Sequence, residues 1–414
     1  MAGFFIVLGD IKDENGKVQK SAMDILTNLC TYGYYSTNLR MNSNTQIWSK
    51  TKVATFADYY SMRTGDYIFF FFNRKIYGVG ELTNIADLND CKFWAYENAN
   101  IPVTQTVVSP IIDDIELENR CICFFKPVNY FPYGVDMDEA LTTYPDSFKS
   151  LRVIQGRSFI KMDDEEAQAL YAIITKSNST RNTQAFDWKP PAFDDSKQLV
   201  ASSRVLSNPS FYKFTIESLL SNFKIRNKDG INEEMAIEAA LVNSLNTGNS
   251  ASIEKLTYVS HQVSASPAKP VEYMEWIDVF GYKTTSDLVK KGISITFAKD
   301  QYYVIEIKRD SLGLKHNRKK APKWVNTNKA VANQLMKYVD WVAKNYASNK
   351  YPMVKGVIVA NDFDDEFIDY CKEMCVRNYN SGYRDASPSV WNNIELIKYS
   401  FNGQTIVFTK VYPI

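Results

Sequence analysis

The sequence predicts two domains of different class, an α+β domain followed by an α/β domain. Its 414 residues are more than one ordinary domain of about 100 to 200 residues needs. Short strand-like runs dominate residues 1–175, whereas strand patterns and helical patterns are mixed in residues 226–414. Residues 176–225 are polar and contain prolines, with little periodicity, which predicts a linker and a connecting helix.

The composition excludes several classes of protein. Hydrophobic residues make up 45% and charged residues 23%, as in a folded globular chain. With 48 Lys and Arg against 47 Asp and Glu, the chain is not a globally basic protein that coats nucleic acid. Its 2 histidines exclude a histidine-rich metal site, and its 6 cysteines lack paired C-x-x-C motifs, so we expect reduced thiols.

The apolar runs are too short to cross a membrane. No basic segment precedes the run at residues 4–8, so it reads as a strand and not as a signal peptide. The run Tyr67–Phe72 falls far short of the roughly 20 residues that a bilayer requires. We therefore expect a cytoplasmic protein without a membrane partner.

The first domain is expected to open with a buried strand and to continue with a hairpin. Tyr67–Phe72 is followed by a polar turn and by a second strand that ends near Glu81. Helical patterns follow at Asp136–Leu141 and Asp163–Thr175.

This hairpin, with G-D-Y-I-F-F-F-F before G-V-G-E-L, resembles the PUA superfamily, including its EVE and YTH modules. The resemblance implies a PUA-like β-barrel over residues 1–175 that holds a flipped, modified base in an aromatic pocket. Trp48, in Ile-Trp-Ser, stands where such modules place a cage tryptophan, and Tyr34, Tyr35 and Tyr60 are candidate partners. Each of these tyrosines could equally belong to the core.

The second domain is expected to form a mixed central sheet flanked by helices. Its predicted elements, in order, are a helix at Ile231–Leu245, strands at Glu272–Tyr282, Ile293–Ala298 and Tyr302–Lys308, a helix at Lys329–Tyr346, and strands at Val354–Ala360 and Ile394–Phe401.

Glu306 and Lys308 form an E-x-K triplet at the end of an apolar strand. Strand side chains alternate, so the two charges share one face. Burying them costs several kcal/mol unless they are paired or ligate a metal. An isolated E-x-K triplet also occurs as a simple ion pair, so the neighbouring residues decide its meaning.

Asp278 lies inside the preceding apolar strand and is expected to converge with Glu306. Two carboxylates on neighbouring strands suit Mg²⁺, which binds through one or two carboxylates plus phosphate oxygens and water. Asp287 is the alternative first carboxylate, although its segment looks helical or looped. Glu238 shares a helix face with Glu234, either as a solvated acidic face or as a carboxylate that approaches the metal site.

A one-sided basic strip follows the Glu306 strand. Such a strip is either a solvated loop or a phosphate-backbone contact, and its near lack of acidic residues favours the contact. The candidate DNA-backbone residues are Arg309, Lys315, Arg318, Lys319 and Lys320.

A helix glutamate, a strand aspartate, the E-x-K strand with a trailing Arg-Asp, and a helical Gln334-Leu-x-x-Tyr together resemble the PD-(D/E)XK nuclease core, especially its NucS-like and restriction endonuclease branch. The resemblance covers roughly residues 226–414. It implies that Asp278 and Glu306 are metal ligands and Lys308 the catalytic lysine, with Glu238 and Gln334 as auxiliary catalytic residues. It also implies Mg²⁺, replaceable by Mn²⁺, and a homodimer for double-strand cleavage.

Together the two halves predict a metal-dependent DNA endonuclease. The leading hypothesis is a modification-dependent restriction enzyme of phage defence, which reads a modified base in double-stranded DNA with its first domain and cuts with its second. A restriction endonuclease that reads unmodified sequence is one alternative. A noncatalytic binder of modified RNA or DNA is the other.

Overall fold

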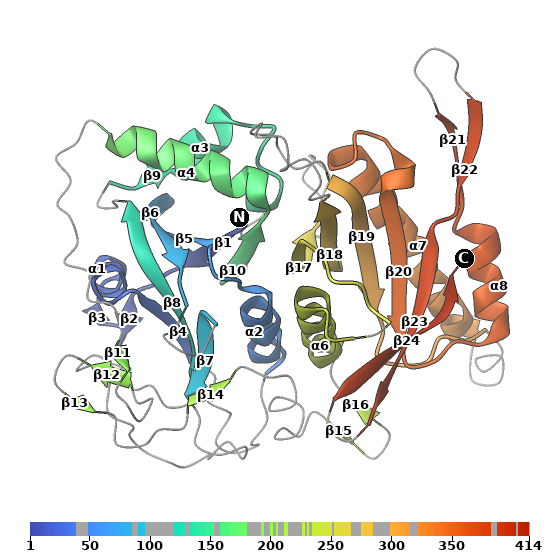
Figure 1. Ribbon diagram of the computed structural model, residues 1–414, viewed down its shortest axis with the longest axis horizontal. Helices are drawn as coiled ribbons and strands as arrows, with labels where there is room; N and C mark the ends of the chain where they lie inside the picture. The colour runs from blue at the N-terminus through green and yellow to red at the C-terminus, as the bar shows by residue number, and fades with distance from the viewer. Residues whose placement is uncertain are drawn as a thin grey trace. The chain divides into compact units, whose positions relative to one another are not determined.

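The structure is a computed structural model that divides into two compact units, Met1–Asn222 and Phe223–Ile414 (Figure 1). The described residues are 1–38, 49–84, 90–95, 120–129, 133–152, 158–179, 192–193, 199–201, 204–205, 211–213, 226–227, 230–231, 234–250, 252–265, 275–284, 299–314, 322–381, 387–402 and 405–413. Both units mix helices and strands, so the chain is of mixed α and β class.

In the described part of the first unit, the largest sheet has nine strands. They are β1 (Gly3–Val7), β4 (Tyr34–Asn38), β5 (Tyr67–Phe72), β6 (Lys75–Leu82), β7 (Lys92–Ala95), β8 (Arg120–Asn129), β9 (Val135–Asp136), β10 (Phe159–Met162) and β14 (Phe211–Lys213). The order is β10-β1-β5-β6-β8-β7-β14, with β4 on β8 and β9 on β6. β1 runs parallel to β5, and the other pairs are antiparallel. The sheet is curled (Figure 1).

Among its described residues, the first unit also contains helices and two small sheets. The helices are α1 (Ala22–Tyr32), α2 (Lys50–Ser61), α3 (Met137–Thr143), the 3₁₀ turn η2 (Ser150–Arg152) and α4 (Asp164–Asn178). The remaining strands are β2 (Ile11–Lys12), paired with β3 (Val18–Lys20), and β11 (Ala192–Phe193), β12 (Leu199–Ala201) and β13 (Arg204–Val205), which form a small sheet.

The aromatic run of β5 builds the core of the first unit. Phe69 is buried beside Phe5 of β1, and Leu170 and Ile173 of α4 pack into the same cluster. Burying one such side chain contributes about 1.5 to 3 kcal/mol. The hairpin prediction and the two helical predictions near α3 and α4 are confirmed.

α1 and α2 are helices that the strand-like appearance of this region did not predict. α1 begins at a capping box, in which Ser21 and Asp24 bond each other's backbone N–H groups. It ends at Gly33, whose φ of 66° lies in the left-handed region that favours glycine.

The segment predicted as a linker contributes to the first unit. α4 continues to Asn178, and β14 pairs antiparallel with β7. The boundary between the two units falls at Asn222 and Phe223.

The second unit is built on a mixed six-stranded sheet. Its strands are β17 (Tyr258–Ser264), β18 (Trp276–Thr284), β19 (Lys299–Ile307), β20 (Val354–Ala360), β23 (Ile394–Phe401) and β24 (Ile406–Pro413), in that spatial order. β19, β20 and β23 are parallel to one another, and the remaining pairs are antiparallel.

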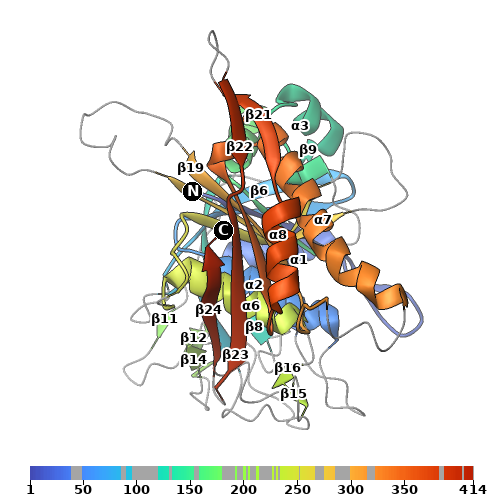
Figure 2. The same ribbon diagram turned by 90° about the vertical axis from the view of Figure 1, so that its right-hand side faces the viewer.

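Helices pack against this sheet. They are α6 (Glu234–Thr247), α7 (Pro322–Asn345), the 3₁₀ turn η4 (Tyr351–Met353) and α8 (Asp365–Met374). α7 packs across β19 and β20, and α6 packs against β17. α7 also lies beside α8 (Figure 2). Two further pairs, β15 (Arg226–Asn227) with β16 (Gly230–Ile231) and β21 (Arg377–Ser381) with β22 (Ser387–Trp391), complete the unit.

Most predicted elements of the second unit are present. β20 and β23 have the predicted bounds, whereas α7 begins at Pro322, seven residues before the predicted start. β17 and β24 were not predicted, and the predicted strand Ile293–Ala298 lies outside the described residues.

Two general expectations concern the whole chain. The six cysteines are free and buried, as predicted for reduced thiols. No helix within the described ranges is long and apolar enough to span a membrane.

Candidate active site

Asp278 and Glu306 lie on neighbouring antiparallel strands at the same end of the sheet. Val279 of β18 pairs with Ile305 of β19, so the antiparallel register brings Asp278, which precedes Val279, opposite Glu306, which follows Ile305. Asp278 also accepts a hydrogen bond through Oδ2 from the backbone N–H of Ile307, at 2.7 Å. The two carboxylates therefore converge, as the strand pattern predicts.

Lys308 directly follows β19 and faces Glu306. Its ammonium donates to Glu306 Oε1 at 2.6 Å, so the two charges of the E-x-K triplet share one face. The Lys308 backbone N–H donates to Val359 O of β20 at 2.8 Å, which fixes the end of the strand. Glu306 itself is 0% exposed.

Glu238 belongs to the buried side of α6. It is 1% exposed, whereas Glu234, one turn earlier, is exposed. Glu238 Oε1 bonds His261 Nδ1 at 2.7 Å, and its Oε2 accepts from Gln262 Nε2 at 3.0 Å. Of the two glutamates, Glu234 is therefore the solvent-exposed one, and Glu238 is buried with both carboxylate oxygens hydrogen-bonded to protein side chains.

Gln262 of β17 connects Glu238 to Asp278. The same Nε2 atom that donates to Glu238 also donates to Asp278 Oδ1, at 3.3 Å. Gln262 has a φ of 49°, in the left-handed region. For a residue other than glycine this conformation costs about 1 to 3 kcal/mol and is concentrated at functional sites.

Sequence analysis missed His261 and Gln262 because it did not predict β17. The signal was present in the sequence: polar residues interrupt the short run Tyr-Val-Ser-His-Gln-Val-Ser, which folds into a mostly buried strand. Buried polar side chains are uncommon unless they are hydrogen-bonded.

Burial and the neighbouring charges shift the pKa values of the site residues. Burial raises the pKa of Asp278 well above its usual value, and the Glu306 and Glu238 carboxylates raise it further. Burial also raises the pKa of Glu306, although the Lys308 ammonium opposes the shift. Burial alone would lower the pKa of Lys308, but Glu306 and Asp278 raise it above its usual value. Such a cluster is favourable for binding a cation.

Gln334 and Tyr338 form a pair on α7. Gln334 Nε2 donates to the Tyr338 hydroxyl at 2.8 Å, as their spacing on one side of the helix allows. Burial raises the pKa of Tyr338 to about 12, and the Glu306 and Asp278 carboxylates act in the same direction. α7 therefore presents this pair within electrostatic range of the carboxylates.

The donor set fits a divalent ion held partly by its substrate. Glu306 Oε2 is buried and has no hydrogen-bond partner, which is costly for a carboxylate oxygen that nothing occupies. Among the described residues, no group of three or more His, Cys, Asp or Glu side chains could hold a metal ion. The protein thus offers two carboxylates, and an ion such as Mg²⁺ would complete its shell with water and phosphate oxygens.

The basic strip is mostly outside the described residues. Arg309 is exposed and forms an ion pair with Asp310, with Nη2 to Oδ2 at 3.1 Å. The other strip residues and two further candidates lie in the segments that the structure leaves undescribed: Lys315, Arg318, Lys319, Lys320, Asp287 and Trp48.

The tyrosines proposed to bind a base lie inside the first unit. Tyr34 is 0% exposed and Tyr60 is 1% exposed, so both are core residues in the structure. Tyr35 is half-buried, and its ring packs edge-on against Phe159 at 5.6 Å between centroids. Of the three, Tyr35 alone has a partly exposed side chain.

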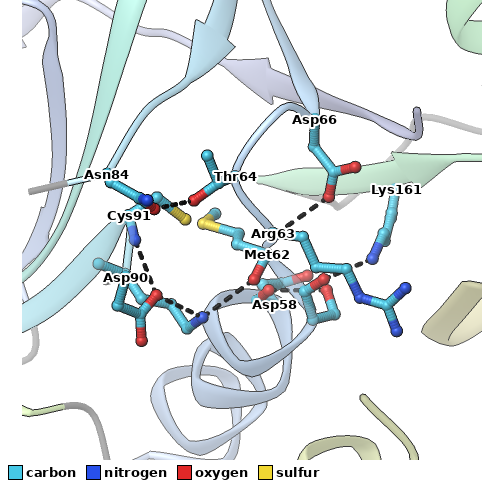
Figure 3. A network of polar contacts seen from close by, with 11 residues as sticks. Asp58, Met62, Arg63, Thr64, Asp66, Asn84, Asp90, Cys91 and Lys161 are labelled. Carbon is cyan, nitrogen blue, oxygen red and sulfur yellow. Dashed lines mark hydrogen bonds and ion pairs between the residues drawn. The ribbon is translucent and has the colours of Figure 1, made fainter. Parts of the chain in front are cut away.

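A polar network closes the C-terminal end of α2 in the first unit (Figure 3). Lys161 Nζ donates to Ser61 O at 2.5 Å, and Lys92 Nζ donates to Met62 O at 2.9 Å. Asp66 accepts from the backbone N–H groups of Ala2 and Arg63, both at 3.1 Å. These buried charged side chains form hydrogen bonds with backbone C=O and N–H groups that have no partner within the helix end or the turn.

Comparisons with known proteins give no family. No protein-family model matches the chain, and no curated protein matches it. Among solved structures, a repair endonuclease from Pyrococcus abyssi shares 17% identity over 28% of this chain and 36% of its own, with a TM-score of 0.15. This chain thus spans about a third of that structure.

Two further solved structures align with similar coverage of this chain. Human THYN1 protein in complex with 5-methylcytosine containing DNA shares 12% identity over 42% of this chain and 98% of its own, with a TM-score of 0.25. A protein from Pseudomonas putida shares 12% identity over 41% of this chain and 98% of its own, with a TM-score of 0.22. TM-scores of this size do not establish a shared fold.

Proposed function

We propose that this protein is a metal-dependent DNA endonuclease whose second unit hydrolyses the phosphodiester backbone. The observation that supports this most directly is the convergence of Asp278, Glu306 and Lys308 at one end of a mixed sheet. Glu306 has one oxygen bonded to Lys308 and one buried oxygen without a partner. The order of elements, helix with Glu238, strand with Asp278, strand with Glu306 and helix with Gln334, is the order that the PD-(D/E)XK resemblance implies.

Each residue of the site has a separate role in the proposed hydrolysis of the phosphodiester. Asp278 and Glu306 would hold Mg²⁺ or Mn²⁺, which supplies electrostatic stabilisation for the negative charge that develops on a phosphodiester. Lys308 can donate to the same phosphate or to the attacking water, because its ammonium lies at Glu306. Water adds to phosphorus and the bond to one sugar oxygen breaks, so one product ends in a phosphate and the other in a hydroxyl.

DNA recognition is assigned to the first unit in this proposal. Its support is the resemblance of the hairpin, now seen as β5 and β6, to base-reading modules, and the position of Trp48 directly before α2. Tyr35 is the candidate partner for a base stacked on Trp48. The protein is then a modification-dependent restriction enzyme, and a homodimer would cut both strands.

A cleavage assay tests the proposal. Purified protein is incubated with modified phage DNA and with unmodified plasmid, in Mg²⁺ and in excess chelator. The proposal predicts cutting in Mg²⁺ alone and a preference for the modified DNA. Cutting of both DNAs equally would favour a restriction enzyme that reads unmodified sequence. Binding without cutting, in any divalent metal, would make the protein a noncatalytic reader.

A further inference from the structure

We propose that Gln262 is a positioning residue that holds the Asp278 carboxylate in its metal-binding orientation, with Glu238 as its anchor. This inference rests on the proposed nuclease function and adds a residue to its site. It also gives Glu238 the role of an orienting group instead of a metal ligand.

The register of the sheet places Gln262 across from Asp278. His261 pairs with Val279 and Val263 pairs with Ile277, so the residues between them face each other on neighbouring strands. Cross-strand neighbours on one face are close enough for their side chains to bond. Gln262 is therefore the residue of β17 best placed to act on the first carboxylate.

The backbone of Gln262 departs from strand geometry at this one position. Its φ of 49° makes it the only non-glycine residue with a positive φ inside a strand among the described residues. A left-handed residue within a buried strand is unfavourable unless the surroundings require it. Here the two hydrogen bonds that the Gln262 amide donates offset this unfavourable backbone conformation.

The hydrogen bonds form a chain from His261 to Asp278. His261 bonds Glu238, Glu238 accepts from Gln262, and Gln262 donates to Asp278 Oδ1. Asp278 Oδ2 is held separately by the Ile307 N–H, next to Glu306. An amide NH₂ is a donor toward both carboxylates, so the arrangement fixes the rotation of Asp278 without adding charge.

The contrast between Glu238 and Glu306 supports this division of roles. Both oxygens of Glu238 are bonded by side chains of β17, whereas Glu306 retains a buried oxygen with no partner. Asp278 lies beside Glu306 across β18 and β19, whereas Glu238 is linked to Asp278 through the Gln262 amide. Groups that orient ligands typically change metal affinity or activity by about 10- to 100-fold when they are removed.

The experiment measures Mn²⁺ binding by electron paramagnetic resonance, without DNA, in four variants of the full chain. Gln262→Met keeps the length of the side chain but removes the donors. Gln262→Gly removes the side chain and relieves the positive φ, so its melting temperature should not fall. Gln301→Met is the matched control, because Gln301 lies on β19 and bonds Tyr303 instead of a site carboxylate. Glu306→Gln removes the proposed ligand itself.

We expect both Gln262 variants to bind Mn²⁺ about 10- to 100-fold more weakly than the wild type. The Mg²⁺ concentration for half-maximal cleavage should rise in parallel, with little change in KM for DNA. Gln301→Met should behave as the wild type, and Glu306→Gln should lose the site.

The outcomes separate this inference from the proposed function. If the Gln262 variants bind as the wild type while Glu306→Gln does not, the positioning role is wrong and the nuclease proposal stands. If Glu306→Gln binds Mn²⁺ as the wild type does, or if the wild type neither binds Mn²⁺ nor cleaves DNA, both are wrong.

Discussion

The two units bury charged side chains for different purposes. In the first unit, Lys161 and Lys92 donate to the last carbonyls of α2, and Asp66 accepts from two backbone N–H groups. In the second unit, Asp278 and Glu306 converge on each other beside Lys308. Buried charges that serve the backbone stabilise a fold, whereas buried like charges that face each other are costly and are retained for binding or chemistry.

Glu166 and Glu306 show that an unpartnered oxygen alone does not identify a site. Each has one buried oxygen without a hydrogen-bond partner. The other oxygen of Glu166 accepts from the backbone N–H groups of Lys149 and Ser150, at 2.5 and 2.7 Å, which ties it to η2. Glu306 instead bonds a lysine and lies beside a second carboxylate, as we expect for the proposed cation site.

The largest expected difference is between Lys308, which is half-buried, and Lys161, which is buried. Lys308→Met should reduce cleavage by about 10²- to 10³-fold, because it removes a donor to the developing phosphate charge. Lys161→Met should leave cleavage unchanged, since Lys161 donates to the backbone of α2 in the first unit. Single-turnover cleavage rates measure both, and similar losses in the two variants would contradict the distinction between the units.

The second prediction concerns base reading by the first unit. Trp48→Ala should weaken binding to modified DNA by about 10- to 100-fold, because stacking on a base contributes about 1 to 3 kcal/mol. Binding to unmodified DNA should change little. Paired binding isotherms and a melting curve check this, and a fall in melting temperature with equal losses for both DNAs would make Trp48 a core residue.

The third prediction uses the pH dependence of stability in the first unit. Burial lowers the pKa of Lys161 to about 7 from a usual 10.5. Between these values the unfolded chain binds more protons than the folded one, so the penalty is full below pH 7 and is relieved as the pH rises toward 10.5. The contribution to the slope is at most about 1.4 kcal/mol per pH unit.

Lys161→Met should therefore flatten this part of the stability profile, so the stability of the variant relative to the wild type should be greatest near neutral pH. Urea midpoints of wild type and variant at several pH values from neutral to alkaline measure the effect. A constant difference between the two proteins over this range would contradict a depressed pKa.

The smallest expected effect concerns the basic strip. Neutralising Arg318, Lys319 and Lys320 together should flatten the salt dependence of DNA binding by roughly 0.9 in the log-log slope for each phosphate that the protein no longer neutralises. Binding constants at several salt concentrations give the slope. An unchanged slope would make the strip a solvated loop.

Sequence reasoning located the proposed carboxylate and lysine site because its residues interrupt apolar strands. Asp278, Glu306 and Lys308 are visible as charges within hydrophobic runs, and the structure brings them together. Gln262 was not visible in this way, because its role depends on a left-handed backbone and on pairing with β18, neither of which the sequence pattern reveals.

Helices and strands were predictable where the hydrophobic pattern along the sequence is strong, and less predictable where that pattern is short. β20 matches because it contains the apolar run Val-Ile-Val-Ala, and β23 matches because apolar and polar residues largely alternate along it. α1 was missed although its Ser21 and Asp24 capping box and its terminal Gly33 are start and stop signals. α2 was also missed, although Val53, Phe56, Ala57 and Tyr60 recur at helical spacing and form its buried face.

Glu306 is proposed to belong to a metal-dependent nuclease site, whereas Glu166 is bonded to the backbone of residues 149 and 150. The most direct test is the same substitution at both positions, Glu306→Gln and Glu166→Gln, with Mg²⁺-dependent DNA cleavage and melting temperature measured side by side. The account predicts that Glu306→Gln loses about a thousandfold or more in cleavage without a fall in melting temperature, because a metal ligand supplies several kcal/mol to the transition state. Glu166→Gln should cleave as the wild type. Full cleavage by Glu306→Gln would contradict the account.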